Sequence, residues 1–434
     1  MVSLIHWPVS LRRRLVYFLI PISLVGSVGM PVCSFGQAAE PLQLSELIQE
    51  ALTNNPEIAA AAQAWAAAKS RISQAGALPD PMLSLRLQNI GPSPSIGEEE
   101  MSMAGLSVSQ IVPFPGKRSL SEGAALEESR QMEAMLEETR RRVLAELKRL
   151  YFELALIKRS EAMVDEIQKL LKTLTETAHA RYSVGEGIQQ DVLRAQTELT
   201  RLTDRRIRLD QEGKKVKAAI NAVILRPPGA VLGDPIPIRS PKPVLTEDLF
   251  ESAATAQSPM IRGSDRTVAA KERMLQMARR DRLPDFELSL GYFDRGRFES
   301  LYEAMVSMNL PLYYRSRQGA RIREAEADLA GAREGLNQDR QKVRLQVSDL
   351  YREITTSDRL RTLIEQGLLP QARLSFESAK AGYEVGKVDF LTLLNNLTSL
   401  FEDEIGAEEM RFRYQRALAE MEELTGLDLI GSNH

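Results

Sequence analysis

Hydrophobic side chains recur at spacings of three, four or seven residues through a long segment without proline, residues 119–182. The recurring positions include Leu136, Val143, Leu147, Leu150, Leu154 and Ile157. This spacing is typical of helices that pack in coiled coils. At about 1.5 Å per residue, one helix over this segment would span roughly 100 Å. Such a length indicates an extended helical protein rather than a compact domain.

The long helix is predicted to end in a turn at residues 183–187, where Gly185 and Gly187 accept the backbone angles that terminate a helix. The helical period resumes over residues 190–225 and stops at the Pro-Pro-Gly sequence of residues 227–229. The two helices are therefore expected to form an antiparallel hairpin whose tip is the turn at 183–187.

Upstream of this hairpin the hydrophobic period changes from 3.6 to 2, which is typical of strands with one apolar and one polar face. Two strands are predicted, at about residues 82–90 and 101–112, with a polar loop at 91–100. The apolar positions are Leu83, Leu85 and Leu87 in the first strand and Ala104, Leu106 and Val108 in the second. The two strands are expected to pair as a β-hairpin.

The second half of the chain repeats the pattern of the first. Tyr182, Val184 and Gly185 recur 201 residues further along as Tyr383, Val385 and Gly386. The Leu-Pro-Asp sequence at residues 78–80 recurs at 283–285, again before a predicted strand. The second half is predicted to contain strands at about 286–293 and 302–310, a charged loop at 294–300, one long helix from about 317 to 383, a tip at 384–388 and a return helix over 390–424.

The patterns together predict a mainly α-helical fold with a small β part, built from long antiparallel coiled-coil hairpins and four amphipathic strands. Two structural repeats are expected. The predicted divisions are a signal peptide at 1–36, a first repeat at 37–229, a proline-rich linker at 230–244, a second repeat at 245–425 and a tail at 426–434.

The N-terminal segment combines Arg12, Arg13 and Arg14 with the apolar run 15–30 and small residues after it, which is the pattern of a cleaved secretory signal. An uncleaved membrane anchor is the alternative. Cys33 is a candidate for lipid attachment, although no small residue precedes it. No later segment has 18 consecutive apolar residues, so a membrane role would depend on strands or a surface helix.

Composition excludes several classes of function. The net charge of −3 gives no reason to expect a nucleic-acid partner. One cysteine and three histidines cannot supply the common cysteine or histidine metal motifs, and no catalytic constellation stands out, so we expect no enzyme, no cofactor and no metal site. Met101, Met103, Met305 and Met308 could handle a soft metal, but methionine more often fills apolar gaps.

An isolated four-stranded amphipathic sheet has unpaired edges and an apolar face that needs cover. A secreted chain can solve both problems by pooling strands from several copies into a closed barrel in a membrane. Polar positions of the strands would then line water: Arg86, Gln88, Glu287, Glu303 and Asn309. The alternative is an ordinary sheet that packs on the helices.

The sequence resembles the outer-membrane factor (TolC-like) family of efflux channels along essentially its full mature length. The resemblance rests on the duplication, the two Tyr-x-Val-Gly tips and the two Leu-Pro-Asp sequences. Residues 78–85 (LPDPMLSL) and 108–118 (VSQIVPFPGKR) are most similar to the heavy-metal efflux (CzcC-like) branch. The family implies a homotrimer in the outer membrane of a Gram-negative-type cell, with a 12-stranded barrel on a periplasmic α-helical tunnel. It also implies a periplasmic adaptor and an inner-membrane pump of the RND type as partners.

The resemblance also implies roles for residues near the tips. The turns at Val184-Gly185 and Val385-Gly386 would contact the adaptor. Asp191 and Tyr383 match positions that latch the closed aperture in TolC-like channels.

The acidic ring that narrows the aperture in well-known members would fall on Thr392 and Asn395. Neither is acidic, so this sequence departs from the family pattern there. Asp389 or Glu384 could supply charge instead, and an all-polar constriction would select by size more than by charge.

The sequence thus favours a passive outer-membrane duct for heavy-metal ions, opened by an adaptor and a pump. A duct for drugs or for type I protein secretion is an alternative within the same class. A periplasmic coiled-coil scaffold without a pore is an alternative from another class, but it should carry a single hairpin and compact β-domains.

Overall fold

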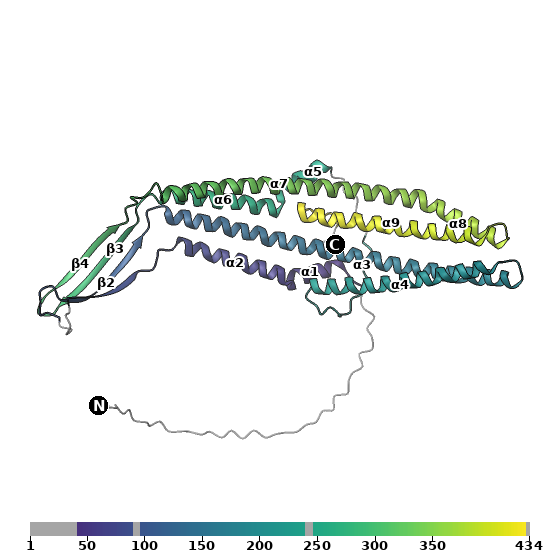
Figure 1. Cartoon of the computed structure of the whole chain (residues 1–434), viewed down its shortest axis with the longest axis horizontal. Helices are drawn as coiled ribbons and strands as arrows, with labels where there is room; N and C mark the ends of the chain where they lie inside the picture. Colours follow the sequence, from purple (N-terminus) through teal and green to yellow (C-terminus); the bar gives the residue numbers. More distant parts are fainter. Residues whose placement is uncertain (1–40, 90–95, 239–245, 431–434) are drawn as a thin grey trace, which may run out of the picture. The chain divides into compact units, whose positions relative to one another are not determined.

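The structure is a computed structural model that describes residues 41–89, 96–238 and 246–430. It confirms a mainly helical fold with a small antiparallel sheet of four strands. Helices lie side by side and the strands continue from one end of them (Figure 1). The predicted signal peptide and Cys33 lie outside the described residues. None of the described helices is both long enough and apolar enough to cross a membrane.

Helix starts follow local capping chemistry. Asn55 precedes the second helix, and its side-chain oxygen accepts hydrogen bonds from the backbone N–H groups of Glu57 (2.9 Å) and Ile58 (3.2 Å). Pro56 occupies the first helical position, where a missing N–H costs nothing. The elements of the first half are α1 (Leu44–Asn54), α2 (Pro56–Gly76), β1 (Met82–Gln88), β2 (Met103–Val112), α3 (Lys117–Ser183) and α4 (Gln189–Val223).

The second half has the same order of elements, with one interruption in its long helix. The elements are α5 (Glu247–Gln257), α6 (Pro259–Arg280), β3 (Phe286–Arg295), β4 (Phe298–Met308), α7 (Gln318–Leu363), the π-helical segment η1 (Ile364–Leu368), α8 (Leu369–Glu384) and α9 (Phe390–Thr425). The structure confirms the predicted helix over 317–383 as a continuous helical segment, Gln318 to Glu384, in which a π-helical turn interrupts the α-helical hydrogen bonds. Pro370 lacks the N–H that an α-helix needs at this point, and the Leu369 N–H instead bonds to the Ile364 carbonyl, five residues back.

The predicted charged loop at 294–300 is also wrong, because β3 and β4 continue into a tight turn. Arg295 still pairs with Phe298 across the hairpin. Gly296 adopts a positive φ of 62°, and its N–H donates to the Asp294 carboxylate at 3.0 Å. At the other end, β4 stops at Met308, and the backbone N–H of Asn309 donates to the Asp285 carbonyl at 3.2 Å.

The sheet has the order β1-β2-β3-β4 with every pair antiparallel. One register row joins Leu85, Leu106, Tyr292 and Tyr302, so apolar side chains of all four strands share one face. These side chains stay exposed: 68% for Leu85 and 83% for Tyr302. Among the described residues, no helix covers this face, and β1 and β4 each present one unpaired edge.

The opposite face of the sheet is polar, with one buried aromatic ring. Arg86 forms an ion pair with Glu303 at 3.0 Å. Phe293 is only 1% exposed because its ring lies over Gly105 and Gly291. The Arg86 guanidinium covers the same ring at 5.0 Å from its centre. A Cβ at Gly105 would lie 2.5 Å from the ring, so this packing requires glycine.

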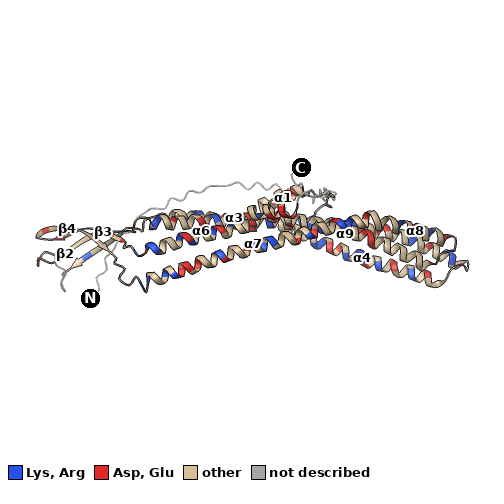
Figure 2. Ribbon diagram, turned by 90° about the horizontal axis from the view of Figure 1, so that it is seen from above, with Lys and Arg blue, Asp and Glu red and all other residues tan. Residues whose placement is uncertain are grey.

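The helix α3 packs along α2 and α6, then α4 and α9 (Figure 1). Acidic and basic residues are interspersed along the long helices (Figure 2). The two largest apolar clusters among the described residues hold the helices together. One surrounds the fully buried Leu147, Leu154 and Phe250, and the other, nearer the hairpin tips, includes Leu171 and Leu393.

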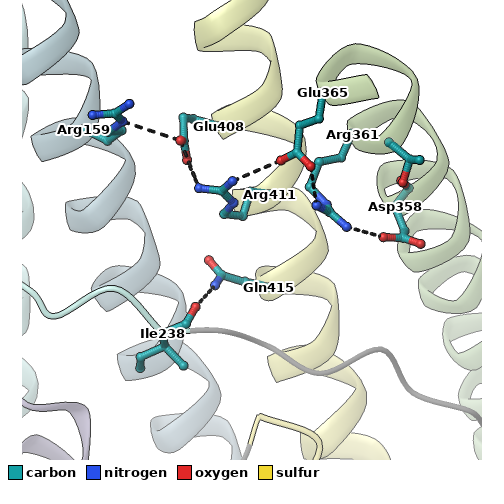
Figure 3. Close-up of polar contacts among 9 residues, drawn as sticks. Arg159, Ile238, Asp358, Arg361, Glu365, Glu408, Arg411 and Gln415 are labelled. Atoms are coloured by element: carbon teal, nitrogen blue, oxygen red, sulfur yellow. Dashed lines mark hydrogen bonds and ion pairs between the residues drawn. The ribbon is translucent and has the colours of Figure 1, made fainter. Parts of the chain in front are cut away.

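A chain of ion pairs joins three helices beside the π-helical segment (Figure 3). Glu365, inside η1, accepts from Arg361 of α7 at 2.7 Å and from Arg411 of α9 at 3.0 Å. Glu408 of α9 contacts Arg411 at 2.7 Å and Arg159 of α3 at 3.6 Å. These contacts fix the irregular segment to α9, and α9 to α3.

The described part of the linker, residues 230–238, is packed against the helices. The Leu42 N–H donates to the Asp234 carbonyl at 2.9 Å, and the Ile236 N–H donates to the Leu42 carbonyl at 3.2 Å. Burial raises the pKa of Tyr151 to about 12, so its hydroxyl stays protonated beside the Ile236 carbonyl at 2.9 Å. Gln415 of α9 donates to the Ile238 carbonyl at 3.0 Å (Figure 3).

Candidate functional site

The two hairpin tips contain the same turn. Gly185 has a φ of 79° and Gly386 a φ of 73°, both in the left-handed region that favours glycine. In the first tip, the Glu186 N–H donates to the Arg181 carbonyl at 2.9 Å. In the second, the Lys387 N–H donates to the Gly382 carbonyl at 2.8 Å. These bonds close the ends of α3 and α8 in the same way.

Each turn presents an apolar side chain to solvent. Val184 is 71% exposed and Val385 is 67% exposed. A Cβ placed on Gly185 would have no atom within 4 Å, so another molecule could approach this backbone closely. The tips therefore offer small, apolar surfaces at the ends of two helical hairpins.

The two turns differ at one pair of equivalent positions. The first tip has Arg181 and Gly187, whereas the second has Gly382 and Val388. A Cβ on Gly382 would lie 2.5 Å from the Val388 side chain, and a Cβ on Gly187 would lie 3.1 Å from the Tyr182 backbone nitrogen. In each turn, one of the two positions is therefore glycine and the other carries a side chain. This side chain is the cationic Arg181 in the first tip and the apolar Val388 in the second.

Arg181 reaches from the last turn of α3 to the second tip. One guanidinium nitrogen donates to the Tyr383 carbonyl, and the guanidinium carbon lies 5.1 Å from the centre of the Tyr383 ring. The Tyr383 ring also meets Phe390 edge-on, at 5.6 Å between ring centres. Tyr383 is only 5% exposed, whereas its counterpart Tyr182 is 45% exposed. The two predicted tips are therefore in contact.

Asp191, in the first turn of α4, belongs to the same group of side chains. Burial raises its pKa, the positive charges of Arg194 and Arg181 oppose this shift, and Asp389 adds to it. Burial and the nearby Asp191 charge also raise the pKa of Tyr383. The structure thus brings Asp191 and Tyr383 together, although no hydrogen bond joins these two described side chains. The positive charge of Arg181 acts to lower the pKa of both side chains.

Thr392 and Asn395 lie in the first turns of α9 and are exposed. Asp389 caps this helix: its carboxylate accepts the Thr392 N–H at 3.0 Å, and this bonding lowers the pKa of Asp389. Asn395 lines a groove of about 560 Å³ between α4 and α9. The lining of this groove also includes residues of both charges, namely Arg194, Arg201, Glu198 and Glu402.

The predicted strand positions share one face of the sheet. Glu303 pairs with Arg86, and the register places Glu287 and Gln88 on the same face. Asn309 follows the end of β4. His179 is exposed on α3, and among the described residues no group of three or more His, Cys, Asp or Glu side chains could hold a metal ion.

Sequence reasoning missed Arg181 and Phe390. The signal available was the comparison of the two tips, in which Arg181 stands against Gly382 and Phe390 against Gln189. At these positions the two tips carry different side chains and make different contacts.

Known proteins support this description. The relative "cobalt-zinc-cadmium resistance protein CzcC" from Cupriavidus metallidurans is 21% identical over 376 residues, covering 85% of this chain and 86% of that protein. The solved structure of CusC matches with a TM-score of 0.79 at 15% identity, covering 90% of this chain and 95% of that one. The outer membrane protein VceC from Vibrio cholerae matches with a TM-score of 0.76 at 18% identity, covering 88% and 96%.

A family model described as "Outer membrane efflux protein" matches residues 47–222 and 251–427, one segment in each half of the chain. The two segments together account for most of the sequence. This chain therefore belongs to the outer membrane efflux protein family and resides in the outer membrane, with its helical part on the periplasmic side.

Proposed function

We propose that this chain is the outer-membrane channel of a tripartite system that exports heavy-metal ions, opened by a periplasmic adaptor and an inner-membrane pump of the RND type. The observation that carries the proposal is an uncovered amphipathic sheet joined to long helical hairpins with exposed apolar tips. The similarity to a cobalt-zinc-cadmium resistance protein supports metal ions as the cargo.

Three copies of the chain would close the sheet into a barrel of twelve strands. The free edge of β4 in one copy would pair with the free edge of β1 in the next, which removes all exposed edges. The apolar face, with Leu85, Leu290 and Tyr302, would contact lipid. The face that carries Arg86 and Glu303 would line a water-filled lumen. The strands β2, β3 and β4 have 10, 10 and 11 residues, the length that a tilted strand needs to cross a bilayer, whereas β1 has 7.

The hairpin tips would form the periplasmic mouth and the adaptor contact. Val184 and Val385 are exposed apolar residues on turns that backbone hydrogen bonds close, and Gly185 leaves its backbone accessible. Asp191 and Tyr383 would take part in the latch that keeps this mouth closed. With Thr392 and Asn395 at the constriction, the closed mouth would select by size rather than by a ring of carboxylates.

Metal sensitivity of cells tests the proposed cargo. The chain, with its adaptor and pump, is expressed in a Gram-negative host that lacks its own channels of this family. We expect restored resistance to Co²⁺, Zn²⁺ and Cd²⁺, with lower metal content in the cells and unchanged drug sensitivity.

A double variant, Val184→Asp with Val385→Asp, serves as the control because it places charge on both tips without disturbing a buried contact. It should reach the outer membrane and give no resistance. Restored drug resistance without metal resistance would instead identify a drug duct. Equal metal resistance with and without the chain would contradict the proposal.

A further inference from the structure

We infer that residues 309–317, the junction segment between β4 and α7, form with Arg282 a binding site for anionic phospholipid headgroups on the periplasmic side of the outer membrane. The inference rests on the proposed barrel, which places the apolar face of the sheet against lipid. The junction segment joins the strands to the helices (Figure 1). In a barrel with a periplasmic helical part, this is the level at which the protein meets the membrane surface.

The exposed apolar face of β4 continues into the junction segment. Leu310 is exposed, Leu312 is 77% exposed and Tyr313 is 79% exposed. The segment is an ordered turn, in which the Arg317 N–H donates to the Tyr313 carbonyl at 3.0 Å. Tyrosine, with its apolar ring and polar hydroxyl, is favoured where hydrocarbon meets water. The junction segment therefore extends the proposed lipid-facing surface to the headgroup level.

The same segment carries positive charge without acidic neighbours in the sequence. Residues 309–323 contain four arginines and no acidic residue. Among the residues that the structure describes, the exposed side chains of Arg282 and Arg317 form no hydrogen bond or ion pair. Arg315 donates only to the hydroxyl of the adjacent Tyr314, at 3.2 Å. These three guanidinium groups are therefore available to an anion.

Two contacts bring Arg282 to the junction segment. The Asn309 N–H donates to the Asp285 carbonyl at 3.2 Å. Arg321, in the first turn of α7, forms an ion pair with Asp281 at 3.0 Å. Arg282 thus lies in the short connection between two residues that contact the two ends of the junction segment. Guanidinium groups bind phosphate through paired hydrogen bonds, so the cluster is complementary to a phosphate headgroup in charge and in geometry.

The equivalent junction of the first half, between β2 and α3, uses its cations within the chain. Lys117 donates to the Asp285 carboxylate at 2.8 Å, and Arg118 donates to the Gly76 carbonyl at 2.8 Å. Both side chains are therefore held by protein partners, in contrast to Arg282 and Arg317. The lipid site belongs to the second half of the chain, and a trimer would carry three such sites.

Lipid retention by the purified trimer in detergent tests this site. Delipidated protein is mixed with phosphatidylglycerol or with phosphatidylcholine, whose headgroup has no net charge, and bound lipids are counted by native mass spectrometry. We expect preferential binding of phosphatidylglycerol, and added salt should weaken it. The triple variant Arg282→Ala, Arg315→Ala, Arg317→Ala should bind phosphatidylglycerol at least tenfold more weakly, because each arginine at an anionic surface contributes about fivefold.

Two further variants control for charge and for geometry. Arg201→Ala, Arg208→Ala, Lys214→Ala removes the same number of charges from exposed side chains of α4 and should bind phosphatidylglycerol as the wild type does. Replacement of the three junction arginines by lysine keeps the charge and loses the planar fork, so its affinity should fall between the wild type and the alanine variant. The mass of the trimer shows whether each variant is assembled.

The outcomes separate the lipid site from the function on which it rests. Equal retention of both lipids by the wild type would overturn the site, and so would equal affinity of the junction and α4 variants for phosphatidylglycerol. Displacement of the lipid by inorganic phosphate at the same concentration would also overturn it, because the cluster would then recognise the free ion. If the alanine variant does not assemble, the wild-type lipid preference and the lysine variant decide. Selective lipid binding by a protein that gives no metal resistance would overturn only the proposed cargo.

Discussion

Replacing Glu422 with alanine is expected to destabilise the helical part of the protein by about 3 kcal/mol or more, because it removes the centre of a buried polar group. The Glu422 carboxylate accepts from the Lys148 ammonium at 2.5 Å, with both side chains 10% exposed or less. It also accepts the backbone N–H groups of Leu429 at 2.7 Å and Ile430 at 2.8 Å. Alanine would remove the buried acceptor that the Lys148 ammonium and the two backbone N–H groups share, and would release the end of the chain.

The measurement is thermal unfolding of the purified protein in detergent, followed by the circular dichroism of the helices. Hydrogen exchange at Leu429 and Ile430 reports the release of the C-terminal segment. Asp210→Ala is the matched control, because Asp210 pairs with Lys214 at 2.7 Å on an exposed face of α4. It should leave the melting temperature unchanged. Equal melting temperatures for both variants would show that Glu422 does not hold α9, α3 and the C-terminal segment together.

Substitution by arginine should reduce folding at one of two neighbouring residues of β1 and have no effect at the other. Leu85 lies on the exposed apolar face and Ser84 on the polar face, in the middle of the strand. Arginine on the lipid face of a barrel costs about 2–4 kcal/mol near the bilayer centre, whereas arginine facing the lumen remains in water. Leu85→Arg should therefore reduce the amount of folded protein in the outer membrane severalfold, and Ser84→Arg should not.

Folding into lipid vesicles, measured by the electrophoretic shift of the folded form, compares the two variants directly. The natural Arg86 already shows that the Ser84 face accepts a guanidinium, since it pairs there with Glu303. If Ser84→Arg folded as poorly as Leu85→Arg, the assignment of lipid and water to the two faces would be wrong.

The helical hairpins and strands were predictable because their signals are local and long. The alternation at Leu83, Leu85 and Leu87 continues over a whole strand, and the helical spacing continues over most of α3. A repeat 201 residues apart, as between Gly185 and Gly386, tests such predictions twice within one chain.

The missed features depend on contacts between distant residues. Phe293 is buried on the polar face only because Gly105 and Gly291 lie beside it on two strands, and no local pattern contains that register. The contact of Arg181 with Tyr383 joins residues that are far apart in sequence, so no local pattern indicated it. The π-helical segment Ile364–Leu368, just before Pro370, was not predicted because the apolar spacing continues through it.

The mass of the purified protein tests the central claim most directly. If three copies close one barrel in the outer membrane, the protein should be extracted only with detergent and should have the mass of a trimer after correction for bound detergent. Disruption of the trimer should expose the edges of β1 and β4 and lead to aggregation. A monomer that stays in solution without detergent would contradict the claim.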